Sequence, residues 1–132
     1  ASMGGLISLY AFGRFPERFG LVGGMSPSLF FGEEALTRWL SHRPPAGGRV
    51  YLDIGTLEGR RNRRRRTAPK SPSGAMCRLR RLRRGFEKAG YRLGVDLEWI
   101  EEPGGRHDEA AWARRLPGML DFLFPAPSGL SG

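Results

Sequence analysis

Helical and extended segments alternate along the whole of this 132-residue chain, and this alternation constrains its fold more than any other feature. Strands are predicted at 20–25, 49–55 and 97–101, and helices at 4–14, 33–41, 76–89 and 109–124. Such alternation favours parallel strands joined by helical crossovers. A parallel sheet is covered on both faces and rarely stops at three strands. We therefore expect an α/β fold with about three parallel strands and flanking helices, forming the edge portion of a larger sheet.

Two of the predicted helices have faces that can be assigned from their spacing. In 76–89 the apolar positions recur every three or four residues, and the other face is basic, with Arg78, Arg80, Arg81, Arg83 and Arg84. In 109–124 we expect an inward face of Trp112, Leu116, Leu120 and Leu123. Pro117 is expected to kink that helix.

The basic charge of the chain is concentrated in one region. The formal net charge is +9, yet 12 of the 22 basic residues lie between Arg60 and Arg84, where there is no acidic residue. The remainder has 10 basic against 13 acidic residues. Like charges repel in the run Arg60–Arg66 and no apolar residue anchors it, so we expect a flexible basic loop over 60–74. The alternative is a polyanion-binding patch, but the run lacks aromatic residues that could stack on bases, which argues against nucleic acid.

Composition limits the other classes of protein. The chain has one cysteine, Cys77, which excludes an internal disulfide and favours a reducing, cytoplasmic location. No apolar run approaches the roughly 18 residues of a membrane span. Two histidines and one cysteine, far apart, give no metal-ligand spacing, and there is no phosphate-binding glycine motif. We expect neither a metal nor a cofactor.

Ser2 is the first residue of chemical interest. It lies in a turn of small residues, Ala1–Gly5, immediately before a helical segment. A serine hydroxyl becomes a useful nucleophile when a base takes its proton, and a strained strand-to-helix turn is where α/β enzymes expose such a serine. The ordinary alternative is that Ser2 caps the helix.

A base and an acid follow at corresponding places. Ligands bind beyond the carboxyl ends of the strands in open α/β sheets. His107 follows the third strand in a glycine-rich loop, and Glu58 follows the second. Asp53 and Asp108 are rivals for the acid, although alternation turns Asp53 into the sheet and Asp108 adjoins His107. The other histidine, His42, lies by a Pro-Pro loop and is considered incidental.

Four segments together resemble the esterase family of α/β-hydrolases that includes enterochelin-esterase-like and feruloyl-esterase-like enzymes. They are Ala1-Ser2-Met3-Gly4-Gly5-Leu6, Met25-Ser26-Pro27-Ser28, the stretch Tyr51-Leu52-Asp53-Ile54-Gly55-Thr56-Leu57-Glu58, and the stretch Gly104-Gly105-Arg106-His107-Asp108-Glu109-Ala110-Ala111-Trp112. They occur in the family's order and span nearly the whole chain.

The resemblance implies a fold and a site. Residues 1–124 would be the C-terminal part of an α/β-hydrolase domain without its N-terminal strands, and 125–132 a disordered tail. Ser2 would be the nucleophile, His107 the base and Glu58 the acid, with the backbone N–H of Met3 in the oxyanion hole. The family's second oxyanion donor belongs to the half that this chain does not contain.

The expected function is hydrolysis of a small-molecule carboxylic ester through an acyl-enzyme. The competing hypothesis is a non-catalytic fragment whose arginine loop binds acidic partners or nucleic acid. An unpaired strand edge predicts self-association. Leu29, Phe30, Phe31 and Trp39 are expected in the core, with one wall of a substrate pocket as the alternative.

Overall fold

The fold is a three-layer α/β arrangement around one small parallel sheet. The computed structural model describes residues 1–59 and 72–126. The strands are β1 (Leu21–Met25), β2 (Arg49–Gly55) and β3 (Leu97–Glu102), and the sheet order is β1-β2-β3. The helices are α1 (Ser2–Arg14), α2 (Ala35–His42), α3 (Gly74–Lys88) and α4 (Glu109–Leu123), with a 3₁₀ turn at Phe31–Glu34. Both strand pairs are parallel, which confirms the predicted α/β class.

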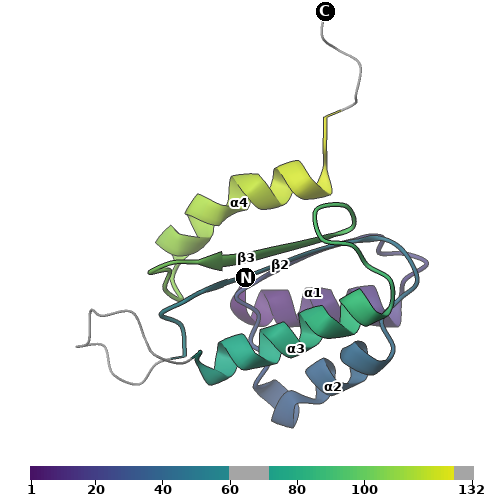
Figure 1. The fold of residues 1–132 in the computed structure, drawn as a ribbon, viewed down its shortest axis with the longest axis horizontal. Coiled ribbons are helices and arrows are strands. Elements are labelled where there is room, and N and C mark those ends of the chain that lie inside the picture. Colours follow the sequence, from purple (N-terminus) through teal and green to yellow (C-terminus); the bar gives the residue numbers. More distant parts are fainter. Residues whose placement is uncertain (60–71, 127–132) are drawn as a thin grey trace, which may run out of the picture.

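The helices divide between the two faces of the sheet. Figure 1 shows α4 alone on one face and α1 and α3 on the other, with α2 packed against α3 farther from the sheet. This is the covering that right-handed crossovers impose on parallel strands. The pairs Met25–Asp53 and Gly55–Glu102 are in register, so the carboxyl ends of all three strands meet at one edge. The loops that leave this edge carry the residues discussed below.

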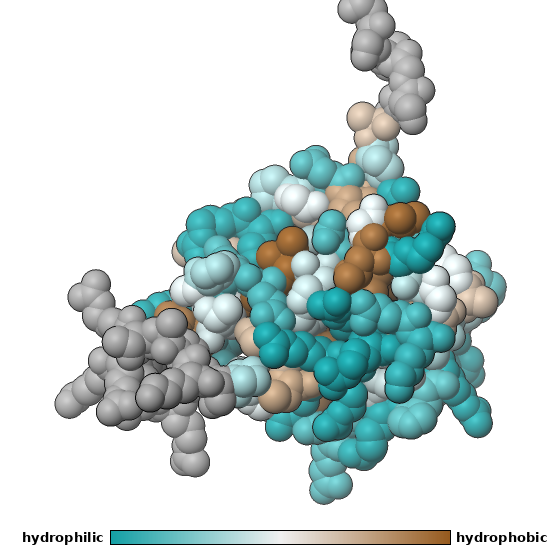
Figure 2. All heavy atoms as spheres, viewed as in Figure 1, coloured by the Kyte–Doolittle hydropathy of each residue, from teal (hydrophilic) through white to brown (hydrophobic). Residues whose placement is uncertain are grey.

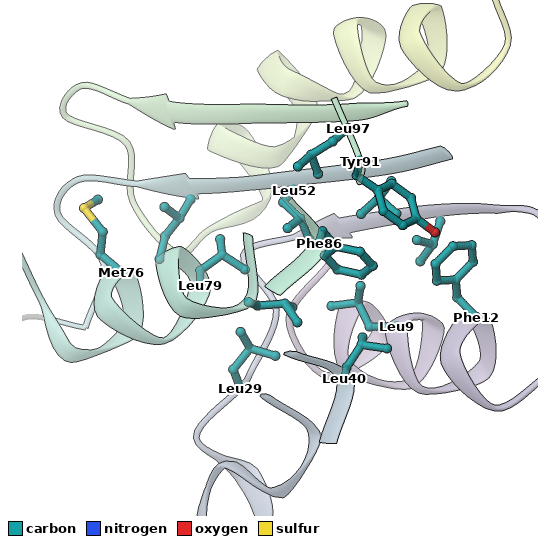
Figure 3. Packing of buried hydrophobic residues seen from close by; sticks show 14 residues of the cluster. Leu9, Phe12, Leu29, Leu40, Leu52, Met76, Leu79, Phe86, Tyr91 and Leu97 are labelled. Atoms are coloured by element: carbon teal, nitrogen blue, oxygen red, sulfur yellow. The ribbon is translucent and has the colours of Figure 1, made fainter. Parts of the chain in front are cut away.

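The larger hydrophobic core lies between the sheet and the helices α1, α2 and α3. Figure 3 shows Leu79 and Phe86 of α3 and Leu9 of α1 directed toward the strands. Phe86 and the buried ring of Tyr91 meet edge to face, with their centroids 5.0 Å apart. Truncating a core side chain of this kind typically costs about 2–5 kcal/mol.

The inward face of α4 differs from the predicted one. Leu116 and Leu120 are 42% and 43% exposed, so their assignment to the core was wrong. Leu123 is buried and Trp112 packs against the core, as predicted, while the other buried residues of α4 are Ala111 and Arg115. Arg115 occupies a core-facing position because carboxylates of the sheet lie opposite it, a reason that helical spacing cannot reveal. The helix continues unbroken through Pro117.

Several element boundaries also differ. Helix α1 begins at Ser2 rather than at residue 4, and α2 begins at Ala35 because the 3₁₀ turn takes its expected first residues. Helix α3 begins at Gly74, the last residue of the predicted loop, because the Ser73 hydroxyl accepts the N–H of Met76 as an N-cap. The arginine run Arg60–Arg66 and most of the predicted tail lie outside the described residues.

Hydrophilic side chains gather over α3 and α2 (Figure 2). The predicted basic face of α3 is largely paired with acids: Arg78 and Arg81 contact Glu34, and Arg80 forms a bidentate pair with Glu101. Among the described residues, none of the helices has the length and apolarity that crossing a membrane requires.

Candidate active site

Ser2 occupies a strained turn at the start of α1. Its φ angle is 54°, in the left-handed region that a non-glycine residue adopts only at a cost of about 1–3 kcal/mol. The N-cap position belongs to Ala1, and the Ser2 hydroxyl is turned instead toward the carboxyl edge of the sheet. The helix approaches closely here, since a Cβ on Gly5 would lie 3.2 Å from the Pro27 side chain. A strained turn at this edge is also where α/β-hydrolases carry a serine.

Ser2, His107 and Glu58 form one hydrogen-bonded chain. Ser2 Oγ lies 2.9 Å from His107 Nε2, and His107 Nδ1 lies 2.9 Å from Glu58 Oε2. The Glu58 side chain is 3% exposed and that of His107 is 43% exposed. The three residues come from the start of α1 and from the loops after β2 and β3, and they span 105 residues of sequence. All three sequence-predicted side chains are thus brought together at the carboxyl edge of the sheet.

The turn that carries Glu58 is tied to the loop that carries His107. Leu57 donates its N–H to the Gly105 carbonyl at 3.0 Å, and Thr56 donates to the Glu102 carbonyl at 3.0 Å. The two backbones touch, because a Cβ on Gly55 would lie 2.3 Å from the Gly105 carbonyl carbon. Glycine is required at this crossing, and the contact fixes the spacing between the loops that carry Glu58 and His107.

Ser26 is a site residue that the sequence reasoning did not single out. Its hydroxyl lies 2.6 Å from Glu58 Oε1 and receives hydrogen bonds from Trp112 Nε1 at 3.1 Å and from Arg115 Nη2 at 2.8 Å. Since both of these partners can only donate, the single hydroxyl proton goes to Glu58. The N–H of Gly55 donates to the same oxygen at 2.7 Å, which leaves Oε2 for His107.

Arg115 was also missed, and it compensates the buried negative charge. Its side chain is 4% exposed, with Nη1 2.6 Å from Glu102 Oε2 and Nε 3.1 Å from Asp53 Oδ2. Burial raises the pKa of Asp53, an effect that the charge of Arg115 opposes. No signal in the sequence marked Arg115, because the apolar spacing of 109–124 predicted an inward face that did not include it.

The rivals for the acid have other roles. Asp53 lies in the sheet as expected, and its Oδ1 accepts the N–H of Ser26 at 3.1 Å. Asp108 is the N-cap of α4, where its carboxylate accepts the N–H of Ala111 at 2.9 Å. His42 bonds the Arg38 carbonyl on α2, away from the site. Neither aspartate is within the hydrogen-bonded chain of His107.

Trp112 supports the imidazole from the side. Its ring meets that of His107 edge to face, with centroids 5.0 Å apart and planes at 86°. The same indole donates to the Ser26 hydroxyl, so one side chain contacts both His107 and the hydroxyl that is hydrogen-bonded to Glu58. Aromatic pairs of this geometry contribute about 0.5–1.5 kcal/mol beyond the area that they bury.

A cavity of about 440 Å³ opens beside the histidine. Four apolar residues were predicted to lie in the core or to line a substrate pocket. Leu29 and Phe30 line this cavity, while Trp39 packs against the core and Phe31 is exposed. The core prediction is therefore wrong for Phe30 and Phe31. Within 1–59 and 72–126, no group of three or more His, Cys, Asp or Glu side chains is placed to hold a metal ion. The chemistry available at this edge is that of a hydroxyl, an imidazole and a carboxylate.

A parallel α/β sheet with a strained serine, a histidine and a carboxylate at its carboxyl edge has the architecture of the α/β-hydrolase class. The chain belongs to an esterase family of this class, described as "Putative esterase", whose sequence model matches residues 1–123.

Two solved structures are similar in fold. The enterobactin esterase FES from Shigella flexneri aligns with a TM-score of 0.63 and 26% identity, over 92% of this chain and 28% of that one. The siderophore hydrolase EstB from Aspergillus nidulans aligns with a TM-score of 0.59 and 19% identity, over 96% of this chain and 48% of that one. Uncharacterized protein YbbA of Bacillus subtilis (strain 168) is 42% identical over 60 residues, which are 46% of this chain and 24% of that protein. The chain therefore matches between 24% and 48% of the length of these relatives.

Proposed function

We propose that this chain carries the serine–histidine–acid site of a carboxylic ester hydrolase that works through an acyl-enzyme. Ser2 is the nucleophile, His107 the general base and then acid, and Glu58 the carboxylate that orients His107. The observation that carries the proposal is the unbroken series of contacts Ser2 Oγ–His107 Nε2 and His107 Nδ1–Glu58 Oε2, both 2.9 Å. Membership of an esterase family supports the reaction class.

The first half of the reaction forms the acyl-enzyme. His107 Nε2 removes the Ser2 proton as Oγ attacks the ester carbonyl, which gives a tetrahedral oxyanion. Glu58 accepts a hydrogen bond from the Nδ1–H group and stabilises the imidazolium, while the proton stays on Nδ1. The imidazolium then protonates the leaving alcohol, and Ser2 is left as an ester of the substrate acid.

Water completes the cycle. His107 takes a proton from water, the hydroxide attacks the Ser2 ester, and the proton returns to Ser2 Oγ as the acid leaves. The backbone N–H of Met3 is the proposed oxyanion donor. It lies in the first turn of α1, where backbone N–H groups have no acceptor within the helix and the helix dipole favours negative charge. One such donor is worth about 10²–10³ in rate.

The test is hydrolysis of p-nitrophenyl acetate and butyrate by the 132-residue chain and its Ser2→Ala and His107→Ala variants. Each variant should lose ~10³-fold or more in kcat, because the serine and the histidine act together and removal of either one disables both. His42→Ala is the matched control, since that histidine lies on α2 and should leave kcat unchanged. A fluorophosphonate probe should label wild type and not Ser2→Ala.

Two results would contradict the proposal. Turnover that survives in Ser2→Ala would place the chemistry elsewhere. No turnover and no labelling, together with salt-sensitive polyanion binding that Ser2→Ala leaves unchanged, would favour the arginine run as the functional element.

A further inference from the structure

The cavity beside His107 contains a cation that the ester chemistry does not use. Its wall includes the apolar side chains Leu29 and Phe30, the catalytic-site residues Glu58 and His107, and Arg78 of α3. Both oxygens of Glu58 already accept hydrogen bonds. Arg78 is therefore the charged residue of this wall that, in the part of the chain that the structure describes, still has N–H groups free to donate hydrogen bonds to a ligand.

The pairing of Arg78 leaves its two outer nitrogens available. Its Nε donates to Glu34 Oε1 at 2.6 Å, and its Nη1 and Nη2 have no hydrogen-bond partner within the described part of the chain. The guanidinium end lies beside Gly74, another cavity residue, because a Cβ on that glycine would be 3.3 Å from Nη1. The donors thus border the cavity rather than bulk solvent alone.

Glu34 does not neutralise this cation. Its second oxygen, Oε2, is taken by Arg81 Nη1 at 2.9 Å, so two guanidinium groups share one carboxylate. Glu34 is ionised at neutral pH, and hydrogen bonding from Arg78 holds its pKa below the ordinary value. The trio of Arg78, Arg81 and Glu34 carries one net positive charge, and Arg78 is its member on the cavity wall.

We infer that Arg78 is a specificity residue that binds a carboxylate carried by the substrate, so the preferred esters are anionic. Guanidinium nitrogens match a carboxylate with two parallel hydrogen bonds, which gives orientation as well as affinity. Leu29 and Phe30 supply an apolar wall for the carbon chain between the carboxylate and the scissile ester. This inference rests on the proposed function, because the same cavity must hold the ester next to Ser2.

Kinetics with matched esters test it. The acyl-side pair is mono-p-nitrophenyl glutarate and its neutral methyl ester, and the alcohol-side pair is 4-acetoxybenzoic acid and its methyl ester. The pair whose anionic ester wild type hydrolyses more efficiently is the one compared. In Arg78→Gln, KM for that anionic ester should rise about tenfold relative to KM for its neutral methyl ester, as expected for loss of a charge-assisted hydrogen bond. Arg81→Gln is the matched control, because Arg81 shares Glu34 but does not line this cavity. Its ratio of KM values should stay at the wild-type level.

A binding measurement separates this inference from the proposed reaction. Calorimetric titration of Ser2→Ala with the amide N-phenylglutaramic acid needs no turnover, and adding Arg78→Gln should weaken the affinity about tenfold. Loss of Ser2-dependent hydrolysis for every ester would overturn the proposed function, while the titration would still decide the carboxylate site. The inference would be overturned if Arg78→Gln weakened anionic and neutral ligands equally. It would also be overturned if Arg81→Gln raised KM for the anionic esters as much as Arg78→Gln does.

Discussion

The hydroxyl of Ser26 lies 2.6 Å from Glu58 Oε1 and donates its only proton there, although the two residues are 32 positions apart. Trp112 and Arg115 fill the accepting positions of the same hydroxyl. Glu58 Oε1 is consequently held by two donors, and Oε2 faces His107. This relationship makes the acid of the proposed site a fixed group rather than a carboxylate free to rotate.

Removing the Ser26 hydroxyl should slow ester hydrolysis. Ser26 has a φ angle of 43°, so Ser26→Gly removes the hydroxyl without adding backbone strain. We expect kcat to fall about tenfold, because Glu58 loses one donor while the N–H groups of Trp112 and Arg115 lose their acceptor. Ser41→Ala is the control, since the buried Ser41 hydroxyl has no hydrogen-bond partner among the described residues and lies outside the site. An unchanged kcat in Ser26→Gly would show that Glu58 needs no such support.

Arg115→Met should destabilise the fold strongly. It leaves the buried Asp53 carboxylate without its pairing cation and takes one of two cations from Glu102, and breaking a buried pair in this way costs about 3–5 kcal/mol. Arg114→Met removes a neighbouring pair with the same Glu102, but Arg114 is 58% exposed and its loss should cost less than about 1 kcal/mol. Urea unfolding of the two variants gives the comparison. Equal midpoints would contradict the buried role of Arg115.

Gly55→Ala should disrupt both stability and activity. Its Cβ would lie 2.3 Å from the Gly105 backbone, which cannot move without displacing the loop that carries His107. We expect a loss of roughly 1–3 kcal/mol and a lower kcat, as for other overpacked sites. Gly118→Ala is the opposite case, because nothing lies within 4 Å and α4 should gain up to about 1 kcal/mol. Thermal melts that move in the same direction for both variants would contradict the close contact.

Tyr91 should make stability fall in alkaline solution. Its hydroxyl donates to the Pro45 and Gly47 carbonyls, and burial raises its pKa to about 12. A raised folded-state pKa gives a contribution that is complete below the unfolded value near 10 and is lost as pH rises through 12. The stability difference between wild type and Tyr91→Phe should therefore shrink between pH 10 and 12. A difference independent of pH would contradict the buried hydroxyl's role.

The outer edge of β1 predicts association of the chain with itself. In the described residues β1 pairs only with β2, so one row of its backbone groups has no strand partner. Exposed Leu21 and Ile7 lie on β1 and on the neighbouring α1. We expect concentration-dependent association in sedimentation velocity, weakened by Leu21→Lys, because charge on an edge opposes strand pairing. A monodisperse monomer at all concentrations would contradict this prediction.

The element order and the strand positions could be predicted because they depend on local patterns. The strand Arg49–Gly55 has the predicted bounds, and the α/β class followed from alternation alone. The inward face of α4 could not be predicted, because helical spacing places the apolar Leu116 inside and the charged Arg115 in solvent. In the structure Arg115 is buried and Leu116 is exposed, because two carboxylates of the sheet lie opposite Arg115, and no local pattern contains that information.

The sequence by itself determined where a nucleophile, a base and an acid stand relative to the ends of strands. The resemblance to an esterase family then named Ser2, Glu58 and His107 as the proposed site, and parallel register brings the loops that carry Glu58 and His107 to one edge of the sheet. Only the tertiary structure decided what holds them: Ser26 meets Trp112 and Arg115 across 86 and 89 residues. Such contacts depend on how α4 packs over the sheet, and packing is a property of the whole fold, while periodicity is a property of one segment.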